Sequence, residues 1–189
     1  MPHSPVLTSI AIPRKLCAAL VLLLTLALSR ESSAQVDQHL RVLDQPLRAL
    51  LERGSAQSPT LRGLLAEVEA TPLLVFVECA IRLPSGVGGR MNFVTSVDGM
   101  RFVRIAVDCA LTERWQIILL AHEIQHALEI GRRPDVDDVE AMELLYEEIG
   151  FPTVRDTGTR SFETEEAMVV QRAVDRELDG RSERALATY

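Results

Sequence analysis

Two histidines in this chain of 189 residues are spaced so that both could bind one metal ion. They occur in the run His122-Glu123-Ile124-Gln125-His126, and residues four apart on a helix lie one turn apart on the same face. Glu123 is rotated about 100° from His122 around the helix axis, so its carboxylate can hold a water molecule beside the metal and accept its proton. Zn²⁺ fits these groups, because zinc accepts nitrogen and oxygen donors in a tetrahedron and lowers the pKa of a water in its open position.

The segment around this run is predicted to be a helix from Thr112 to Ile130. Thr112 is a suitable N-cap, Gly131 would follow the last helical residue, and Pro134 prevents the helix from continuing. One side of this helix carries Ile117, Leu120, Ile124 and Leu128, and the other carries the two histidines with Trp115, Leu119 and Glu129. A helix with these two sides can form the floor of a cleft. The alternative is a pair of surface or core histidines with no metal.

The run is an HExxH motif, and on this basis the chain resembles the zincin metallopeptidases. Their defining helix carries the motif shortly after the strand of an edge hairpin. The resemblance covers about residues 91–170. It implies that His122 and His126 are zinc ligands and that Glu123 is the general base.

The third metal ligand is a choice among several glutamates. The metzincin branch requires glycine and histidine where this chain has Glu129 and Arg132. The aspartate-ligand branch requires a GTxxD run, and the run at 158–162, GTRSF, lacks the acid. The chain is therefore similar to the gluzincins, in which a glutamate from a later helix is the third ligand. We prefer Glu163, which would lie in the first turn of such a helix beside Phe162; an acid there can also simply interact with the helix dipole. The competing candidates are Glu129, Glu140, Glu143 and Glu147.

Two auxiliary roles also have candidates. Glu129 lies seven residues, or about 10 Å, along the helix from the first histidine, so orienting His126 suits it better than binding the metal. A proton donor or oxyanion stabiliser is also expected. Tyr146, Arg101 and Arg104 are candidates, and nothing in the sequence selects among them.

The rest of the chain predicts an α+β fold in which a small antiparallel sheet packs on the motif helix, with further helices on its flanks. The sheet would combine a strand at 73–80 with a hairpin whose arms, 91–97 and 100–107, flank the turn Asp98-Gly99. The predicted helices are 36–53, bent or split at Pro46; one that starts at Ser58-Pro59; 137–149, with a buried stripe of Val139, Met142, Leu145, Tyr146 and Ile149; and one that starts near Ser161 with that serine as N-cap.

Residues 1–34 have the features of a secretory signal peptide. Arg14 and Lys15 precede an uncharged apolar run of 13 residues, 16–28, and small residues then offer a cleavage site after Ala34. A run of 13 is too short to cross a bilayer, which takes about 20 apolar residues. We therefore expect a secreted or periplasmic protein with no stable membrane span after cleavage.

The mature chain, residues 35–189, is expected to form a single zincin-like domain with an acidic surface. The leader holds three of the 20 cations and one of the 27 acids, so 17 cations and 26 acids remain and the net charge is −9. A nucleic-acid partner would require a basic patch and is not expected. Residues 35–71 form a helical N-terminal segment, which is either integral to the fold or a removable inhibitory segment.

The mature chain keeps two cysteines, Cys79 and Cys109, each at the end of a strand-like segment. Export to an oxidising compartment would allow them to form a disulfide. The alternative is two buried free thiols.

These features predict an exported zinc-dependent metallopeptidase-like hydrolase, in which a zinc-activated water attacks the peptide bond of a peptide or protein substrate. A non-catalytic zincin-fold protein that acts as a binding or envelope-associated module is the first alternative. A structural domain in which the motif arose by chance is the second.

Overall fold

The computed structural model describes residues 39–81, 83–153 and 161–186, which belong to one compact unit, Val36–Tyr189, of α+β class. Five helices, a four-stranded sheet and a two-stranded sheet lie within these ranges. None of these helices combines the length and the apolar character needed to cross a membrane. The predicted signal peptide, residues 1–34, lies outside the described residues.

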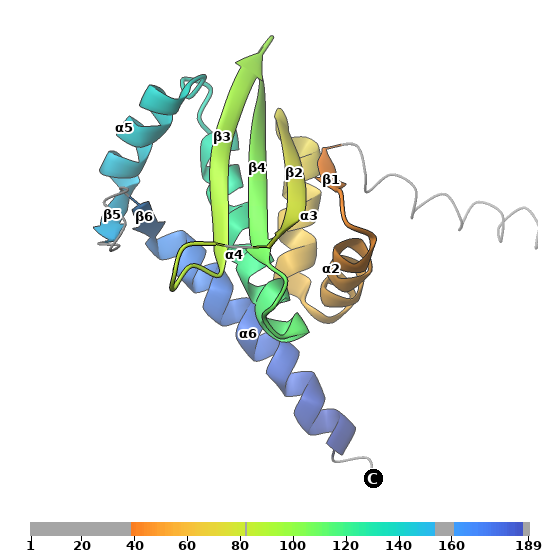
Figure 1. The fold of residues 1–189 in the computed structure, drawn as a ribbon. Helices are drawn as coiled ribbons and strands as arrows, with labels where there is room; N and C mark the ends of the chain where they lie inside the picture. The colour runs from red at the N-terminus through yellow and green to blue at the C-terminus, as the bar shows by residue number, and fades with distance from the viewer. Residues whose placement is uncertain (1–38, 82, 154–160, 187–189) are drawn as a thin grey trace, which may run out of the picture. The chain divides into compact units, whose positions relative to one another are not determined.

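The larger sheet has the strand order β1-β2-β4-β3 (Figure 1). Its strands are β1 (Leu40–Val42), β2 (Leu73–Ala80), β3 (Gly89–Val97) and β4 (Met100–Asp108). β3 and β4 form the predicted hairpin, and both residues of its turn, Asp98 and Gly99, have positive φ, 50° and 78°. β3 is an edge strand of this sheet.

The sheet is mixed, so the prediction of an antiparallel sheet is wrong. β2 runs parallel to β4, and β1 runs parallel to β2. The reason is the path of the chain. After β2 the chain crosses to the edge of the sheet and forms β3, and the hairpin then returns β4 into the place between β3 and β2, where it runs parallel to β2. The strand β1, which was not predicted, reaches its parallel position because two helices connect it to β2.

The N-terminal helices are α2 (Gln45–Gln57) and α3 (Pro59–Ala70). The predicted helix at 36–53 is wrong in its first part, since residues 40–42 form β1. Pro46 lies in the first turn of α2, where proline's missing N–H has no intrahelical partner to lose, so it does not bend the helix. The predicted start of the next helix is confirmed: Ser58 Oγ accepts a hydrogen bond from the Leu61 amide at 2.9 Å.

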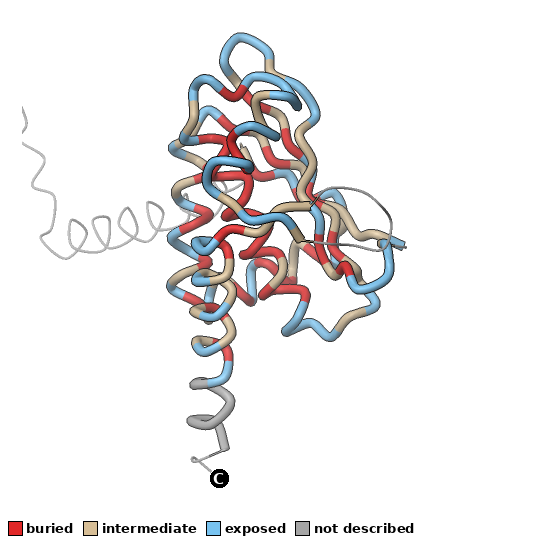
Figure 2. Tube along the Cα trace, turned by 90° about the vertical axis from the view of Figure 1, so that its left-hand side faces the viewer, coloured by how far each residue is buried: buried red, intermediate tan, exposed pale blue. Residues whose placement is uncertain are grey.

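The segment from β1 to α3 shares one hydrophobic core with the motif helix, α4 (Glu113–Gly131). Figure 1 shows α3 and α4 on the same face of the sheet, and Figure 2 shows the buried residues gathered between the strands and the helices. The segment's fully buried contributions include Leu47, Leu61 and Val68. Removing residues 35–71 would therefore expose the core faces of β2 and α4.

The motif helix is buried far more completely than predicted. Thr112 caps it as expected, and Gly131 is its last residue rather than the first beyond it. The apolar side packs on the sheet and α3, while the side with His122 and His126 is also buried. Elements that follow α4 in the chain contribute Tyr146, Glu163 and Thr164 to the contacts on this second side.

Those elements are α5 (Val139–Ile149), β5 (Gly150–Thr153), β6 (Ser161–Thr164) and α6 (Glu165–Leu186). β5 and β6 pair as a small antiparallel sheet. The helix predicted to start near Ser161 begins at Glu165, and Thr164 rather than Ser161 is its cap, because Thr164 Oγ1 accepts a hydrogen bond from the Ala167 amide at 3.1 Å. Residues 161–164 were predicted as helix and are strand, because they pair with β5.

The predicted buried stripe of α5 is only partly right. Leu145 and Tyr146 are buried, but Val139 is 49% exposed and Ile149 is 41% exposed. The helix packs through one narrow side, so the ends of the stripe remain at the surface.

Cys79 and Cys109 form a disulfide, with 5.5 Å between their Cα atoms. It joins the end of β2 to the residue that follows β4, just before α4 begins. Closing a loop of 30 residues in this way contributes roughly 3–4 kcal/mol to the free energy of unfolding.

We predict that Glu177 on α6 stabilises the fold through the start of α3. Its carboxylate accepts hydrogen bonds from Ser58 Oγ at 2.5 Å, Thr60 Oγ1 at 2.7 Å and the Thr60 amide at 3.2 Å. Partial burial acts to raise the pKa of Glu177, but the bonds from Ser58 and Thr60 outweigh it and hold the pKa below the ordinary value. Glu177→Gln should lower the free energy of unfolding at neutral pH by about 1–2 kcal/mol.

The sign of the pH dependence follows from the lowered pKa. The folded carboxyl has the lower pKa, so its contribution is present above the unfolded pKa of about 4.5 and is lost as the pH falls through the folded value. Urea denaturation at several pH values should show the wild type and Glu177→Gln converging below that pH. Glu52→Gln, an exposed change on α2, is the control. A constant difference at all pH values would contradict the prediction.

Candidate metal centre

Three potential metal ligands converge beside α4: His122, His126 and Glu163. Their donor atoms all lie within 4.8 Å of one another. His122 Nε2 is 3.2 Å from His126 Nε2 and 3.1 Å from Glu163 Oε2. Ligands at 2.0–2.1 Å from a tetrahedral ion are separated by about 3.3 Å, so the two separations from His122 match a zinc site, while the whole group lies within 4.8 Å. Both histidines are buried, and Glu163 is half-buried.

Glu163 reaches the histidines from a strand. The sequence placed it in the first turn of a helix, but it lies in β6, where it pairs across from Phe151 of β5. It is therefore brought to α4 by strand pairing and not by a helix N-terminus.

A buried carboxylate, Glu129, fixes the ring of His126 from the side away from these donors. Glu129 Oε2 lies 2.9 Å from His126 Nδ1, and Glu129 Oε1 accepts a hydrogen bond from Thr164 Oγ1 at 2.6 Å. An N–H at Nδ1 directed at Glu129 leaves the lone pair of Nε2 for a metal. Glu129 is thus placed where it can orient His126, and its own oxygens are occupied.

The side chain of Glu123 extends from α4 toward the edge strand β3. A Cβ added to Gly89 would come within 2.8 Å of Glu123 Oε1, so the glycine permits this close approach. Burial raises the pKa of Glu123, opposed by the charges of His126 and His122 and by a backbone hydrogen bond from Met91. A raised pKa makes this carboxylate a stronger base than an exposed glutamate.

Carboxylates dominate the electrostatics of the centre. Burial acts to lower the pKa of His122, but the hydrogen bond with Glu163 and the charges of Glu123, Glu163 and Glu129 outweigh it, so the pKa is raised above 6.5. The surroundings therefore favour a positive charge at this position. Among the described residues, His122 Nδ1 is a buried side-chain atom without a hydrogen-bond partner.

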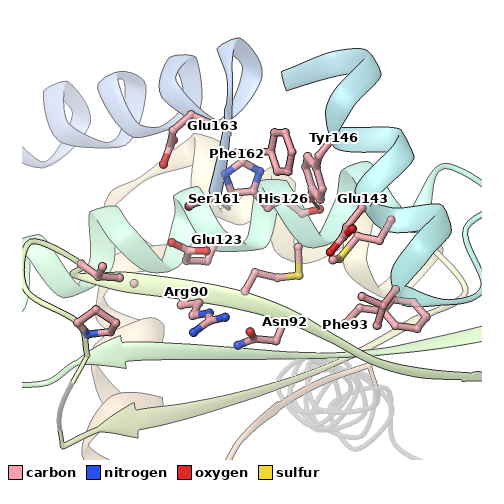
Figure 3. A pocket seen from close by; sticks show the side chains of 16 residues that line it. Arg90, Asn92, Phe93, Glu123, His126, Glu143, Tyr146, Ser161, Phe162 and Glu163 are labelled. Carbon is pink, nitrogen blue, oxygen red and sulfur yellow. Dashed lines mark hydrogen bonds between the residues drawn. The ribbon is translucent and has the colours of Figure 1, made fainter. Parts of the chain in front are cut away.

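A cavity of about 290 Å³ opens beside the centre. Figure 3 shows Glu123 and His126 on α4 in the middle of the view, with β3 along the lower side of the cavity and α5 and β6 along the upper side. Its lining includes Met91 and Phe93 from β3, Met142 and Tyr146 from α5, and Phe162 and Glu163 from β6. The floor predicted from the sequence is therefore found, with walls from elements far apart in the chain.

The three predicted oxyanion stabilisers do not point freely into this cavity. Tyr146 lines it, but its hydroxyl donates a hydrogen bond to the His126 carbonyl at 2.8 Å. Arg101 is buried and donates to the carbonyl oxygens of Val136 and Gly99, and Arg104 is exposed beside Glu78.

The other candidate third ligands on α5, Glu140, Glu143 and Glu147, are all exposed, and of these three Glu143 lines the cavity. The sequence reasoning missed Thr164 and Gly89. Thr164 shows no signal beyond being a common N-cap residue, and Gly89, the first residue of β3, lies just outside the predicted strand 91–97.

Comparison of the chain with protein-family models, with curated proteins and with solved structures finds no match to any of the three.

We predict that Glu129 tunes the metal affinity of the centre. Loss of a carboxylate that orients a ligating histidine typically costs 10- to 100-fold in affinity, so Glu129→Gln should weaken zinc binding by about tenfold or more. Competition of the protein with a chromophoric zinc chelator measures this. Circular dichroism of the same samples reports whether the fold is kept, and Glu140→Gln is the control. Unchanged zinc affinity in folded Glu129→Gln would contradict the assigned role.

Proposed function

We propose that this chain is an exported zinc-dependent hydrolase of peptide bonds, of gluzincin-like zincin type. The observation that carries the proposal is the convergence of the donor atoms of His122, His126 and Glu163 beside the buried Glu123. Two imidazoles and one carboxylate are the protein ligand set of one class of catalytic zinc sites, which keep a fourth position open.

Zn²⁺ held by these three residues would supply Lewis-acid polarisation of the scissile carbonyl and lower the pKa of a water molecule. Glu129 keeps Nε2 of His126 directed at the metal position. Glu123 does not belong to the donor group and lies next to it, on the cavity floor. It is placed to accept a proton from the attacking water and to pass that proton to the leaving amine.

The edge strand β3 offers a way to hold the substrate. One side of β3 pairs with β4, and the other borders the cavity. An extended peptide can add to such an edge through main-chain hydrogen bonds. This arrangement would bring a backbone carbonyl of the peptide next to Glu123 and favours peptide or protein substrates.

Export is part of the same proposal. It is supported by the predicted leader, residues 1–34, and by the Cys79–Cys109 disulfide, which is typical of oxidising compartments. A secreted or periplasmic location follows.

A non-catalytic zincin-fold binding or envelope-associated protein is the second candidate. It is favoured by one observation: the hydroxyl of Tyr146, the candidate oxyanion stabiliser that lines the cavity, is bound to the backbone of α4. In this version the chain binds zinc and peptide without turnover.

The test begins with zinc per chain, measured by elemental analysis of the mature protein and of His126→Ala purified identically. We expect about one zinc in the wild type and none in the variant. Glu123→Gln should keep its zinc but hydrolyse a fluorogenic peptide library at least about 100-fold more slowly. Wild type that holds no zinc when zinc is offered would overturn both candidates. Wild type that holds zinc but cleaves no peptide would leave the binding candidate.

A further inference from the structure

The cavity beside the candidate metal centre has two chemically different ends. One end contains Glu123, His126 and Glu163, which the proposed reaction uses. On the other side, where Figure 3 shows Phe93 and Glu143, the lining also includes the apolar Val139 and Met142 of α5 and the polar Asn92 of β3. Val139, which was predicted to lie in the core, is 49% exposed and lines the cavity.

One carboxylate, Glu143, stands at this apolar end. α5 carries four glutamates, Glu140, Glu143, Glu147 and Glu148, and of these only Glu143 lines the cavity. Figure 3 shows its side chain extending from α5 toward the space between α4 and β3, beside Tyr146. Within the described ranges, no hydrogen bond or ion pair involves the Glu143 carboxylate.

We propose that this end of the cavity is a subsite for a long basic side chain, arginine or lysine, of the bound peptide; this rests on the proposed function. The apolar stem of such a side chain would pack against Phe93, Val139 and Met142, as long cationic side chains do on apolar surfaces. Its charged head would reach Glu143 and form a charge-assisted hydrogen bond. The combination of an apolar wall with one carboxylate fits this ligand chemistry.

Other side chains fit the subsite less well. A purely apolar side chain would take water from Glu143 without giving it a partner, which is unfavourable. An acidic side chain would be repelled by the Glu143 carboxylate. Arg90 also lines the cavity, but its neighbours Met91 and Phe93 pack toward the core, so alternation along β3 turns Arg90 to the opposite face of the sheet.

The experiment uses pentapeptides with blocked ends, alanine at every flanking position, and a central arginine, citrulline, norleucine or glutamate. Citrulline keeps the shape of arginine and removes its charge. Binding to zinc-loaded Glu123→Gln is measured by calorimetry, so that hydrolysis does not interfere. We expect the arginine peptide to bind about tenfold more tightly than the citrulline peptide, as one charged hydrogen bond in a half-open site allows.

The same ratio is then measured with Glu143→Gln, Glu143→Lys and the matched control Glu140→Gln, each combined with Glu123→Gln. The arginine preference should fall to about unity with Glu143→Gln and persist with Glu140→Gln. It should change to a preference for glutamate with Glu143→Lys. A preference that Glu143→Gln leaves intact, tightest binding of the norleucine peptide, or no binding of any peptide would overturn the subsite.

Cleavage of the same peptides by the wild type separates this inference from the proposed function. Glu143-dependent binding of arginine without cleavage would support the subsite and refute catalysis. Cleavage whose arginine preference is unaffected by Glu143→Gln would refute the subsite alone.

Discussion

The geometry of the candidate centre depends on a buried carboxylate, Glu129, that holds two segments together. It lies against Nδ1 of His126 on its own helix and accepts a hydrogen bond from Thr164, 35 residues later in the chain. A charge buried in this way is stable only when its lone pairs are satisfied. The contacts that satisfy Glu129 are the same contacts that aim the histidine and bring β6 to the helix.

Because α4 is covered on both sides, its polar side chains must find hydrogen-bond partners within the protein. The helix is covered by the sheet and α3 on one side and by α6 and the α5–β6 segment on the other. His122, Glu123, Gln125, His126 and Glu129 are all buried. Several of them are satisfied by residues from other elements: Met91 on β3, Thr164 on β6 and Glu166 on α6. The core around the motif is therefore specified by polar contacts as much as by apolar packing.

Features encoded within a few consecutive residues could be predicted. Thr112 marks the start of α4 and Asp98-Gly99 the hairpin turn, because each acts through its own backbone. The α4 motif likewise needs only helical spacing. By contrast, β1 is three residues long and exists through pairing with β2, and the parallel arrangement of β2 and β4 depends on the path of the intervening chain. Local periodicity contains neither kind of information.

Glu163 was expected to lie beside the histidines, and it does, but the secondary structure predicted for it was wrong. Ser161 was the predicted N-cap, but residues 161–164 pair with β5, and the helix is capped three positions later by Thr164. The difference matters physically, because successive side chains of a strand point to opposite sides. Glu163 can therefore reach His122 while Thr164 reaches Glu129, about two turns farther along α4. Attachment at these two points places the Glu163 carboxylate before any ion is bound and so reduces the ordering cost of binding one.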